Sequence, residues 1–252
     1  MLLRFSKYSL HFILFIFFIF GCAQSDTKQP KNLSHFSGNY LRAIQLNENF
    51  SSFQDTLQNL SLNSLSALTS DSDAHLAFWL NIYNASVQVR LAQHLDKYAH
   101  RDRFFNERWI SICGKTISLN DIELGILGRE KKGEFIAKLQ TKHFDPRIHF
   151  ALNCGAASCP PIHVYTKKNI HHELDATTRQ FLLNNSSYTQ FSNTLKVDEL
   201  LKWYVADFGG TNGINALHQQ YGIVPLGVNP TVVFSAYDWT VKSKAFESSK
   251  SH

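Results

Sequence analysis

The longest periodic stretch of the chain lies at residues 73–95, DAHLAFWLNIYNASVQVRLAQHL. Apolar residues recur there at the spacing of an α-helix over about six turns. Asp71 or Ser72 is expected to cap this helix, because a short polar side chain accepts hydrogen bonds from the free N–H groups of the first turn. The apolar positions cover a wide arc, so the pattern predicts a buried central helix.

Two amides interrupt the apolar surface of this helix. Asn81 and Asn84 lie three positions apart and therefore share a face. A buried amide needs hydrogen-bond partners. These two side chains are therefore expected either to brace a loop or to line a site.

Further along the chain the pattern changes from helical to extended. Residues 109–119, WISICGKTISL, alternate around a central Gly and predict a β-hairpin, whereas 120–127, NDIELGIL, predicts a short helix capped by Asn120. The compact apolar run 147–153, RIHFALN, predicts a buried strand. The segment 154–161, CGAASCPP, predicts a loop because Gly and two prolines interrupt regular structure.

Helical patterns return in the last third of the chain. They lie at residues 167–185, 198–207 and 213–220. Helices and strands do not alternate regularly, which favours an α+β fold in which a central buried helix packs on a small, mainly antiparallel sheet. Aromatic residues of this part are expected in the core or in the wall of a cleft; they are Trp203, Tyr204, Phe208 and Trp239.

The N-terminus has the pattern of a cleaved export signal. Arg4 and Lys7 precede an apolar run at residues 11–20, which is too short for a comfortable membrane span, and Gly21-Cys22 follows it as the processing site that ends a signal peptide at residues 1–21. The Gly-Cys step resembles the lipobox of bacterial lipoproteins, which implies an acylated Cys22; an ordinary secretory signal is the alternative. A polar tether at 22–38 and one globular domain at 39–245 are then expected.

Composition narrows the class of protein. The chain of 252 residues is 44% hydrophobic and 18% charged, which is typical of a packed globular protein. Cleavage after residue 21 lowers the 25 basic residues to 23 against 20 acidic ones. Because this excess is small and no basic run is present, we expect no nucleic-acid partner.

The most chemically suggestive segment is 145–161, DPRIHFALNCGAASCPP. His149 and Cys154 suggest a base and a nucleophile, Cys154 and Cys159 suggest a disulfide in an oxidising compartment, and His163 extends the set to a metal site. Structural zinc prefers cysteine pairs two to four residues apart, which disfavours the metal, and we expect no metal and no cofactor. An extended strand would separate His149 from Cys154 by about 15 Å, so their contact requires a returning loop.

Three blocks together are similar to a known family. AFWLNIYNA, LNDIELGIL and DPRIHFALNCGAASCPP, followed by LLKWYVADF and YDWTV, resemble the domain-of-unknown-function 547 family over roughly residues 70–240. The resemblance implies a papain-like, cysteine-proteinase-like fold with a Glu–His–Cys set. Matched residue by residue, that set is Glu123, His149 and Cys154.

The chain departs from the family pattern near Glu123. Leu124 stands where the family commonly has His, and Gly128 stands at an Arg position, with Arg129 displaced by one. If the missing side chains bind substrate, the departures imply a changed specificity or a lost activity.

These observations lead to one functional hypothesis and one alternative. We expect a cysteine-dependent hydrolase or acyltransferase that acts on an amide or thioester, with Cys154 as nucleophile, His149 as base and Glu123 as the group that orients it. Asn81 or Asn84 would bind substrate as a donor to the oxyanion. The alternative is a non-catalytic envelope binding module on the same fold.

The hypothesis carries expectations about location, partners and thiols. The protein is expected in the bacterial cell envelope, anchored by lipid to the outer membrane and facing the periplasm, with a peptide, glycan or acyl substrate. A nucleophile in a disulfide cannot attack, so we expect Cys154 and Cys159 to be separate thiols. A Cys154–Cys159 bridge would instead make the loop a structural staple.

Overall fold

The computed structural model describes residues 29–246. Its α-helices are α1 (Leu33–Gln45), α2 (Ser51–Gln58), α3 (Leu62–Ala67), α4 (Ser72–Gln93), α5 (Arg101–Asn106), α6 (Glu134–Ala137), α7 (Ile170–Asn185), α8 (Leu200–Trp203) and α9 (Gly210–Gln220). The strands are β1 (Ile110–Ile112), β2 (Lys115–Ile117), β3 (Ser187–Thr189), β4 (Thr194–Asp198) and β5 (Thr231–Ser235). Shorter helical turns are η1 (Leu68–Ser70), η2 (Leu95–Ala99), η3 (Asp121–Ile126), η4 (Pro146–Phe150) and η5 (Lys167–Asn169). The expected α+β class is confirmed.

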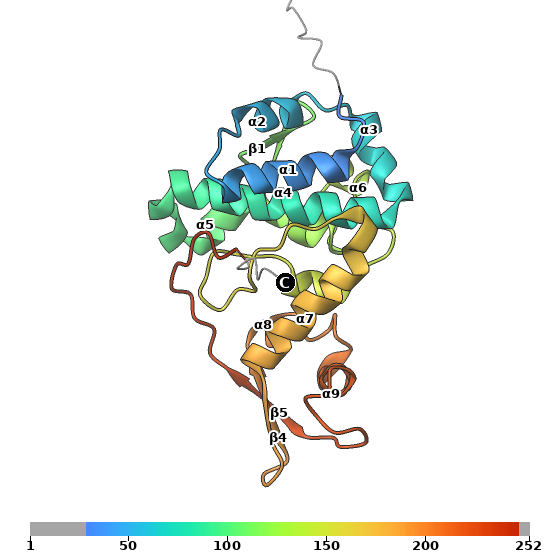
Figure 1. The fold of residues 1–252 in the computed structure, drawn as a ribbon, viewed down its shortest axis with the longest axis vertical. Coiled ribbons are helices and arrows are strands. Elements are labelled where there is room, and N and C mark those ends of the chain that lie inside the picture. The colour runs from blue at the N-terminus through green and yellow to red at the C-terminus, as the bar shows by residue number, and fades with distance from the viewer. Residues whose placement is uncertain (1–28, 247–252) are drawn as a thin grey trace, which may run out of the picture.

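Helix α4 is the centre of the molecule, as its wide apolar arc predicts. Asp71 caps it by accepting from the backbone N–H of Ala74, and every residue from Ala74 to Leu91 is buried. Its main neighbour is α1, which lies along it in the upper part of Figure 1. The main neighbours of α4 are helical segments, among them α1, η1 and α7, and the small β1–β2 sheet contributes Ile110, Ile112 and Ile117 to the buried cluster around it.

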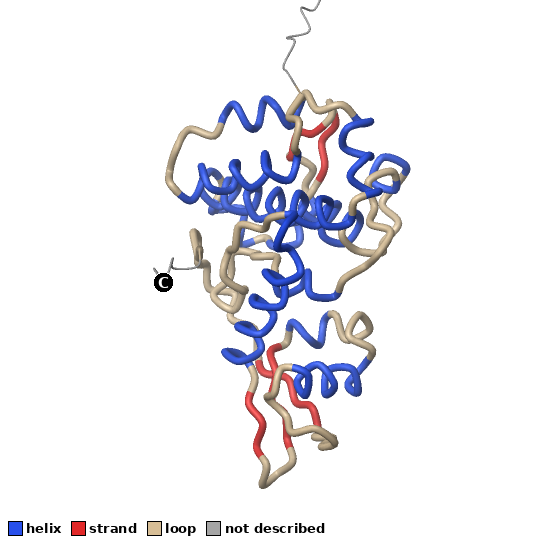
Figure 2. The backbone as a smooth tube through the Cα atoms, turned by 45° about the vertical axis from the view of Figure 1, so that its right-hand side comes forward, coloured by secondary structure: helices blue, strands red, loops and turns tan. Residues whose placement is uncertain are grey.

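The strands form two separate small sheets at opposite ends of the molecule (Figure 2). The β1–β2 hairpin is the one predicted, and its turn at Cys113 and Gly114 has positive φ at both positions, as a type I′ turn requires. In the second sheet β4 pairs antiparallel with β3 and parallel with β5. The expected antiparallel pairing is found in β1–β2 and β3–β4, whereas β4–β5 is parallel.

The predicted strand at 147–153 is wrong. Pro146 begins the 3₁₀-helix η4, and the Asp145 carboxylate accepts from the backbone N–H of Arg147. Proline favours the first position of a helix, and a short apolar run does not distinguish a buried strand from a buried turn of helix. The loop predicted at 154–161 is confirmed.

Two other boundaries differ from the sequence prediction. The polar tether expected to reach residue 38 ends earlier, because α1 begins at Leu33 and buries Leu33, Ser34 and Ser37 against the core. The helix predicted at 198–207 shrinks to α8, since Asp198 ends β4. The export signal and Cys22 lie outside the described residues.

The core has two clusters of buried side chains. One surrounds α4, and the other joins α7, β4 and α9 in the lower part of Figure 1. Trp239 packs against both clusters. The candidate site lies where these clusters meet.

Candidate functional site

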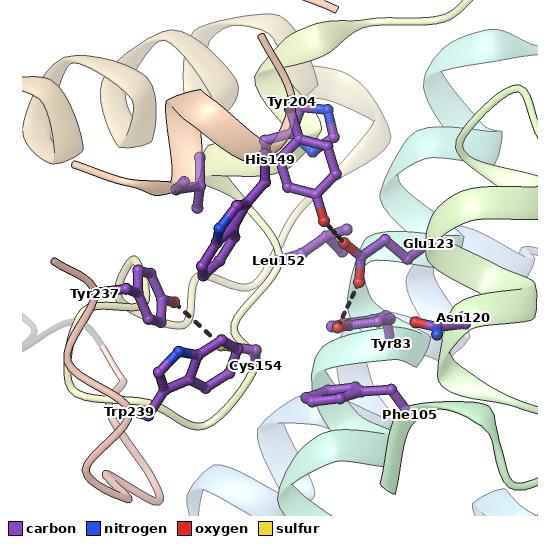
Figure 3. Close-up of a pocket in the computed structure, with 12 residues that line it drawn as sticks. Tyr83, Phe105, Asn120, Glu123, His149, Leu152, Cys154, Tyr204, Tyr237 and Trp239 are labelled. Carbon is purple, nitrogen blue, oxygen red and sulfur yellow. Dashed lines mark hydrogen bonds between the residues drawn. The ribbon is translucent and has the colours of Figure 1, made fainter. Parts of the chain in front are cut away.

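A cavity of about 190 Å³ opens between the two core clusters (Figure 3). Its lining is mostly aromatic and includes one carboxylate. The lining residues are Tyr83, Phe105, Asn120, Glu123, His149, Leu152, Cys154, Leu200, Trp203, Tyr204, Tyr237 and Trp239. The three residues of the expected Glu–His–Cys set thus face one cavity.

Glu123 belongs to η3, a single turn of π-helix that follows the hairpin. Its two carboxylate oxygens accept hydrogen bonds from the hydroxyls of Tyr83, at 2.7 Å, and Tyr204, at 2.6 Å. Figure 3 shows both phenols pointing at this carboxylate. The Glu123 charge raises the pKa of Tyr204, and burial followed by the same charge raises the pKa of Tyr83. Both phenols therefore stay protonated and act as donors.

His149 has a different partner from the one expected. Its Nε2 lies 2.9 Å from Oδ2 of Asp207, and its ring stacks on Tyr204 with centroids 3.6 Å apart. Burial lowers the pKa of His149, so the imidazole is neutral at pH 7. A carboxylate accepts, so Nε2 carries the proton, and Nδ1 is a buried acceptor without a hydrogen-bond partner among the described residues.

Asp207 is the site residue that sequence reasoning missed. It follows α8 in the segment LLKWYVADF, 58 residues after His149. Asp207 takes the orienting position assigned to Glu123, whose oxygens are bonded to tyrosines instead. An acidic residue inside a family block was the available signal, but sequence separation gave no reason to pair it with His149.

The departures at residues 128 and 129 have a structural explanation. Arg129 pairs with Asp207 and lies over the Phe144 ring, 4.5 Å from its centroid. A Cβ at Gly128 would overlap the backbone carbonyl oxygen of Leu124, so the turn after η3 excludes a side chain there. Arg129, one position later, therefore pairs with Asp207, which is the hydrogen-bond partner of His149.

The expectation that Cys154 and Cys159 are separate thiols is wrong. The two form a disulfide, with their Cα atoms 6.1 Å apart. The Tyr237 hydroxyl lies 3.2 Å from Sγ of Cys154 and 3.1 Å from Sγ of Cys159. The five-residue step in CGAASC lets the loop turn back on itself, and positive φ at Gly155 supports that turn.

Asn81 and Asn84 brace the backbone rather than lining the cavity. Asn81 donates to the carbonyl of Tyr165 and accepts from its N–H. Asn84 donates to the carbonyl of Ala151 at 3.0 Å and accepts from the N–H of Asn153 at 2.9 Å. Both amides are fully buried and satisfied, so the predicted substrate-binding role gives way to the loop-bracing alternative.

The segment between His149 and Cys154 is therefore fixed from α4. Asn153 extends the network, because its side chain donates to the Pro160 carbonyl and accepts from the N–H of Gly155. This polar network holds both ends of the disulfide loop at the cavity wall.

Two other features of the described chain bear on the class of protein. Residues 29–246 contain no group of three His, Cys, Asp or Glu side chains arranged to hold a metal ion. In the same part of the chain, no helix has the length and apolar character that a membrane span requires.

Comparison with known families covers three of the blocks on which the sequence resemblance rests, at residues 77–85, 119–127 and 145–161, but not the blocks at 200–208 and 237–241. Residues 66–182 match the model of DUF547, a protein of unknown function. The match supports the DUF547 family for this part of the chain. No curated protein and no solved structure matches the chain.

The DUF547 match includes some of the residues that line the cavity but not all of them. Glu123, His149 and Cys154 fall inside the matched residues. The far wall of the cavity lies beyond them and consists of Leu200, Trp203, Tyr204, Tyr237 and Trp239. The site therefore needs the C-terminal part of the chain as well as the DUF547 region.

Proposed function

We propose that this protein is an envelope binding module whose aromatic cavity takes a small ligand or one side chain of a larger partner. The observation that carries the proposal is the Cys154–Cys159 disulfide, which occupies the thiol that the family resemblance assigns as nucleophile. The cavity remains open beside it. A ligand could therefore enter the cavity while the Cys154–Cys159 disulfide stays intact.

The lining supports a recognition role. Small-molecule sites are mostly apolar and have a few fixed polar groups that orient the ligand. Here the rings of Phe105, Trp203 and Trp239 supply apolar surface, and Glu123 is a carboxylate fixed by two phenols. Trp203 is 43% exposed, so a ligand can reach its ring from solvent.

The proposal is tested by NMR titration of oxidised protein with butylammonium, 1-butanol and butyrate. Binding of at least one probe, seen as shifts of the indole N–H signals of Trp203 and Trp239, is expected. Trp203→Ala should weaken that binding, whereas Phe191→Ala should not, because Phe191 is fully exposed and outside the cavity lining. Absence of indole shifts with all three probes would contradict a binding role.

A second candidate is a cysteine-dependent hydrolase or acyltransferase that works once a dithiol has reduced the disulfide. It is favoured by one observation: Cys154 faces the same cavity as His149, whose ring Asp207 orients. The Cys154 thiolate would attack the carbonyl of an amide or thioester, and His149 would transfer the thiol proton to the leaving amine or thiol. Water or an acceptor would then release the acyl group.

Thiol labelling separates this candidate from the binding module. After dithiothreitol treatment, an activated Cys154 would react with iodoacetamide at neutral pH much faster than free cysteine. Cys113 is a slow internal reference, because burial raises the pKa of its thiol to about 11. Labelling of Cys154 at the rate of a simple thiol would rule out the hydrolase.

The finer parts of the family hypothesis belong to the same proposal. We propose a papain-like relationship, which the Glu–His–Cys blocks support, and an acylated Cys22 that anchors the protein in the outer membrane, which the signal-like start supports. Palmitate incorporation should be abolished by Cys22→Ser. Labelling that survives this substitution would remove the anchor from the account.

A further inference from the structure

We propose that the ligand of this cavity is an organic ammonium ion. The inference rests on the proposed binding function and adds the chemical class of the ligand. It depends on the charge of the lining, on the state of Glu123 and on the aromatic walls. Each observation is independent of the family resemblance.

The lining carries a single formal charge, and that charge is negative. The described residues that line the cavity include one carboxylate side chain, Glu123, and neither Lys nor Arg. His149 is neutral because burial lowers its pKa. Of the two nearby arginines, Arg129 is paired with Asp207 and Arg101 lies over Trp239. Beside Glu123, where no basic side chain lines the cavity, an anionic ligand would be repelled.

The Glu123 carboxylate has no ion-pair partner among residues 29–246. Two phenol donors satisfy one acceptor site on each oxygen. An ionised carboxylate has about four such sites, so each oxygen can accept a further bond from a ligand. A partly buried carboxylate without a cation is a favourable place for a positively charged ligand.

The aromatic walls suit the same ligand. Trp203 stacks on Trp239 at 5.5 Å between centroids, and Tyr237 packs against both rings. The faces of such rings attract cations, most strongly when water is excluded. Trp239 already shows this attraction, since the Arg101 guanidinium lies 4.6 Å from its ring centroid.

The volume limits the size of the bound group. A cavity of about 190 Å³ corresponds to roughly six water molecules at about 30 Å³ each. A quaternary headgroup of choline type or the end of a lysine side chain fits this space. The two sources differ in chemistry, because a primary ammonium donates N–H bonds to Glu123 and a quaternary ammonium offers charge alone.

The experiment compares matched probes on the wild-type, oxidised protein by calorimetry or NMR titration. Butylammonium represents the lysine source and is compared with 1-butanol. Choline represents the headgroup source and is compared with 3,3-dimethyl-1-butanol, its uncharged counterpart of the same shape. We expect one cation, or both, to bind at least about tenfold more tightly than its neutral counterpart.

Two variants test whether the preference for cations comes from Glu123. Glu123→Gln should bring cation affinity down to that of the neutral probes, whereas Glu134→Gln, at an exposed position away from the cavity, should leave it unchanged. Because the wild-type probe comparison needs no variant, a folding defect in Glu123→Gln would not block the test. Thermal melting of each variant reports such a defect.

The outcomes also separate this inference from the proposed function. If both neutral probes bind as tightly as their cations, the cavity is a binding site and the ammonium preference is wrong. Tighter binding of butyrate than of butylammonium would overturn it in the same way. If no probe binds, the binding function fails together with the inference.

Discussion

The carboxylate of Asp207 lies 2.9 Å from Nε2 of His149 and also pairs with Arg129. His149 is thus oriented by a residue of the C-terminal part, beyond the DUF547 match. The bond fixes the proton on Nε2 and leaves Nδ1 as a buried acceptor. This arrangement places a neutral, oriented imidazole at the cavity wall.

Asp207→Asn should lower the pKa of His149 further. Burial already lowers this pKa, and the hydrogen bond and charge of Asp207 oppose that effect. Loss of the carboxylate also leaves the Arg129 charge unpaired nearby, which acts in the same direction. The measurement is an NMR titration of the His149 ring protons, with Asp238→Asn as an exposed control; an unchanged or higher pKa would contradict the assignment.

Stability should decrease as the pH falls below about 6.5. Burial lowers the pKa of His75, His149 and His218, so the unfolded state binds protons there more readily than the folded state. Their stabilising contribution is complete above the unfolded pKa and is lost progressively as the pH falls toward the lowered folded values.

Thermal midpoints between pH 7.5 and pH 5.5 measure this dependence. His218→Gln should flatten the curve, because His218 is fully buried, whereas the exposed His172→Gln should leave its slope unchanged. A midpoint that rises toward pH 5.5 would show that the sign is wrong.

Asn84→Ala should destabilise the fold by about 3 kcal/mol, because it leaves two buried backbone groups without partners. Those groups are the Ala151 carbonyl and the Asn153 N–H, which hold the segment between His149 and Cys154. Denaturant unfolding measures the loss, and Asn63→Ala on the exposed side of α3 is the matched control. Equal stability of the two variants would show that the amide is not a brace.

Gly128→Ala should cost about 1–3 kcal/mol, because an added Cβ would overlap the Leu124 carbonyl and meet that of Glu123 at 2.9 Å. Gly38→Ala is the comparison, since its Cβ would make an ordinary contact of 3.5 Å with Val164. Thermal melting of both variants should show a clear loss only at residue 128. A tolerated methyl group there would remove the steric explanation for the glycine.

Local pattern predicted much of the fold. The helical period predicts α4 with Asp71 or Ser72 as its cap, of which Asp71 is the one observed, and alternation around Gly114 predicts the hairpin. The run 147–153 predicts a strand but begins as a helical turn, because a short apolar run has no period that separates strand from helix. Proline at residue 146 was the local signal for the helical start.

The site was only partly predictable for a different reason. The family resemblance predicts that Glu123, His149 and Cys154 act together, and the three residues do face one cavity. Their hydrogen-bond partners, however, come from segments that are distant in sequence. Asp207 contacts His149, and Tyr204 contacts Glu123, only because the C-terminal part of the chain folds back onto this region. Likewise, neither composition nor spacing decided between thiols and a disulfide, because the return of the loop is a tertiary property.

The central claim is that the oxidised protein binds with Cys154 closed in a disulfide. Mass spectrometry of non-reduced peptides from the purified protein, alkylated during purification without reductant, tests it most directly. The account predicts a stoichiometric Cys154–Cys159 bridge, with Cys113 alkylated as the free thiol of the described chain. Alkylated Cys154 and Cys159 would contradict the account and restore Cys154 as an available nucleophile.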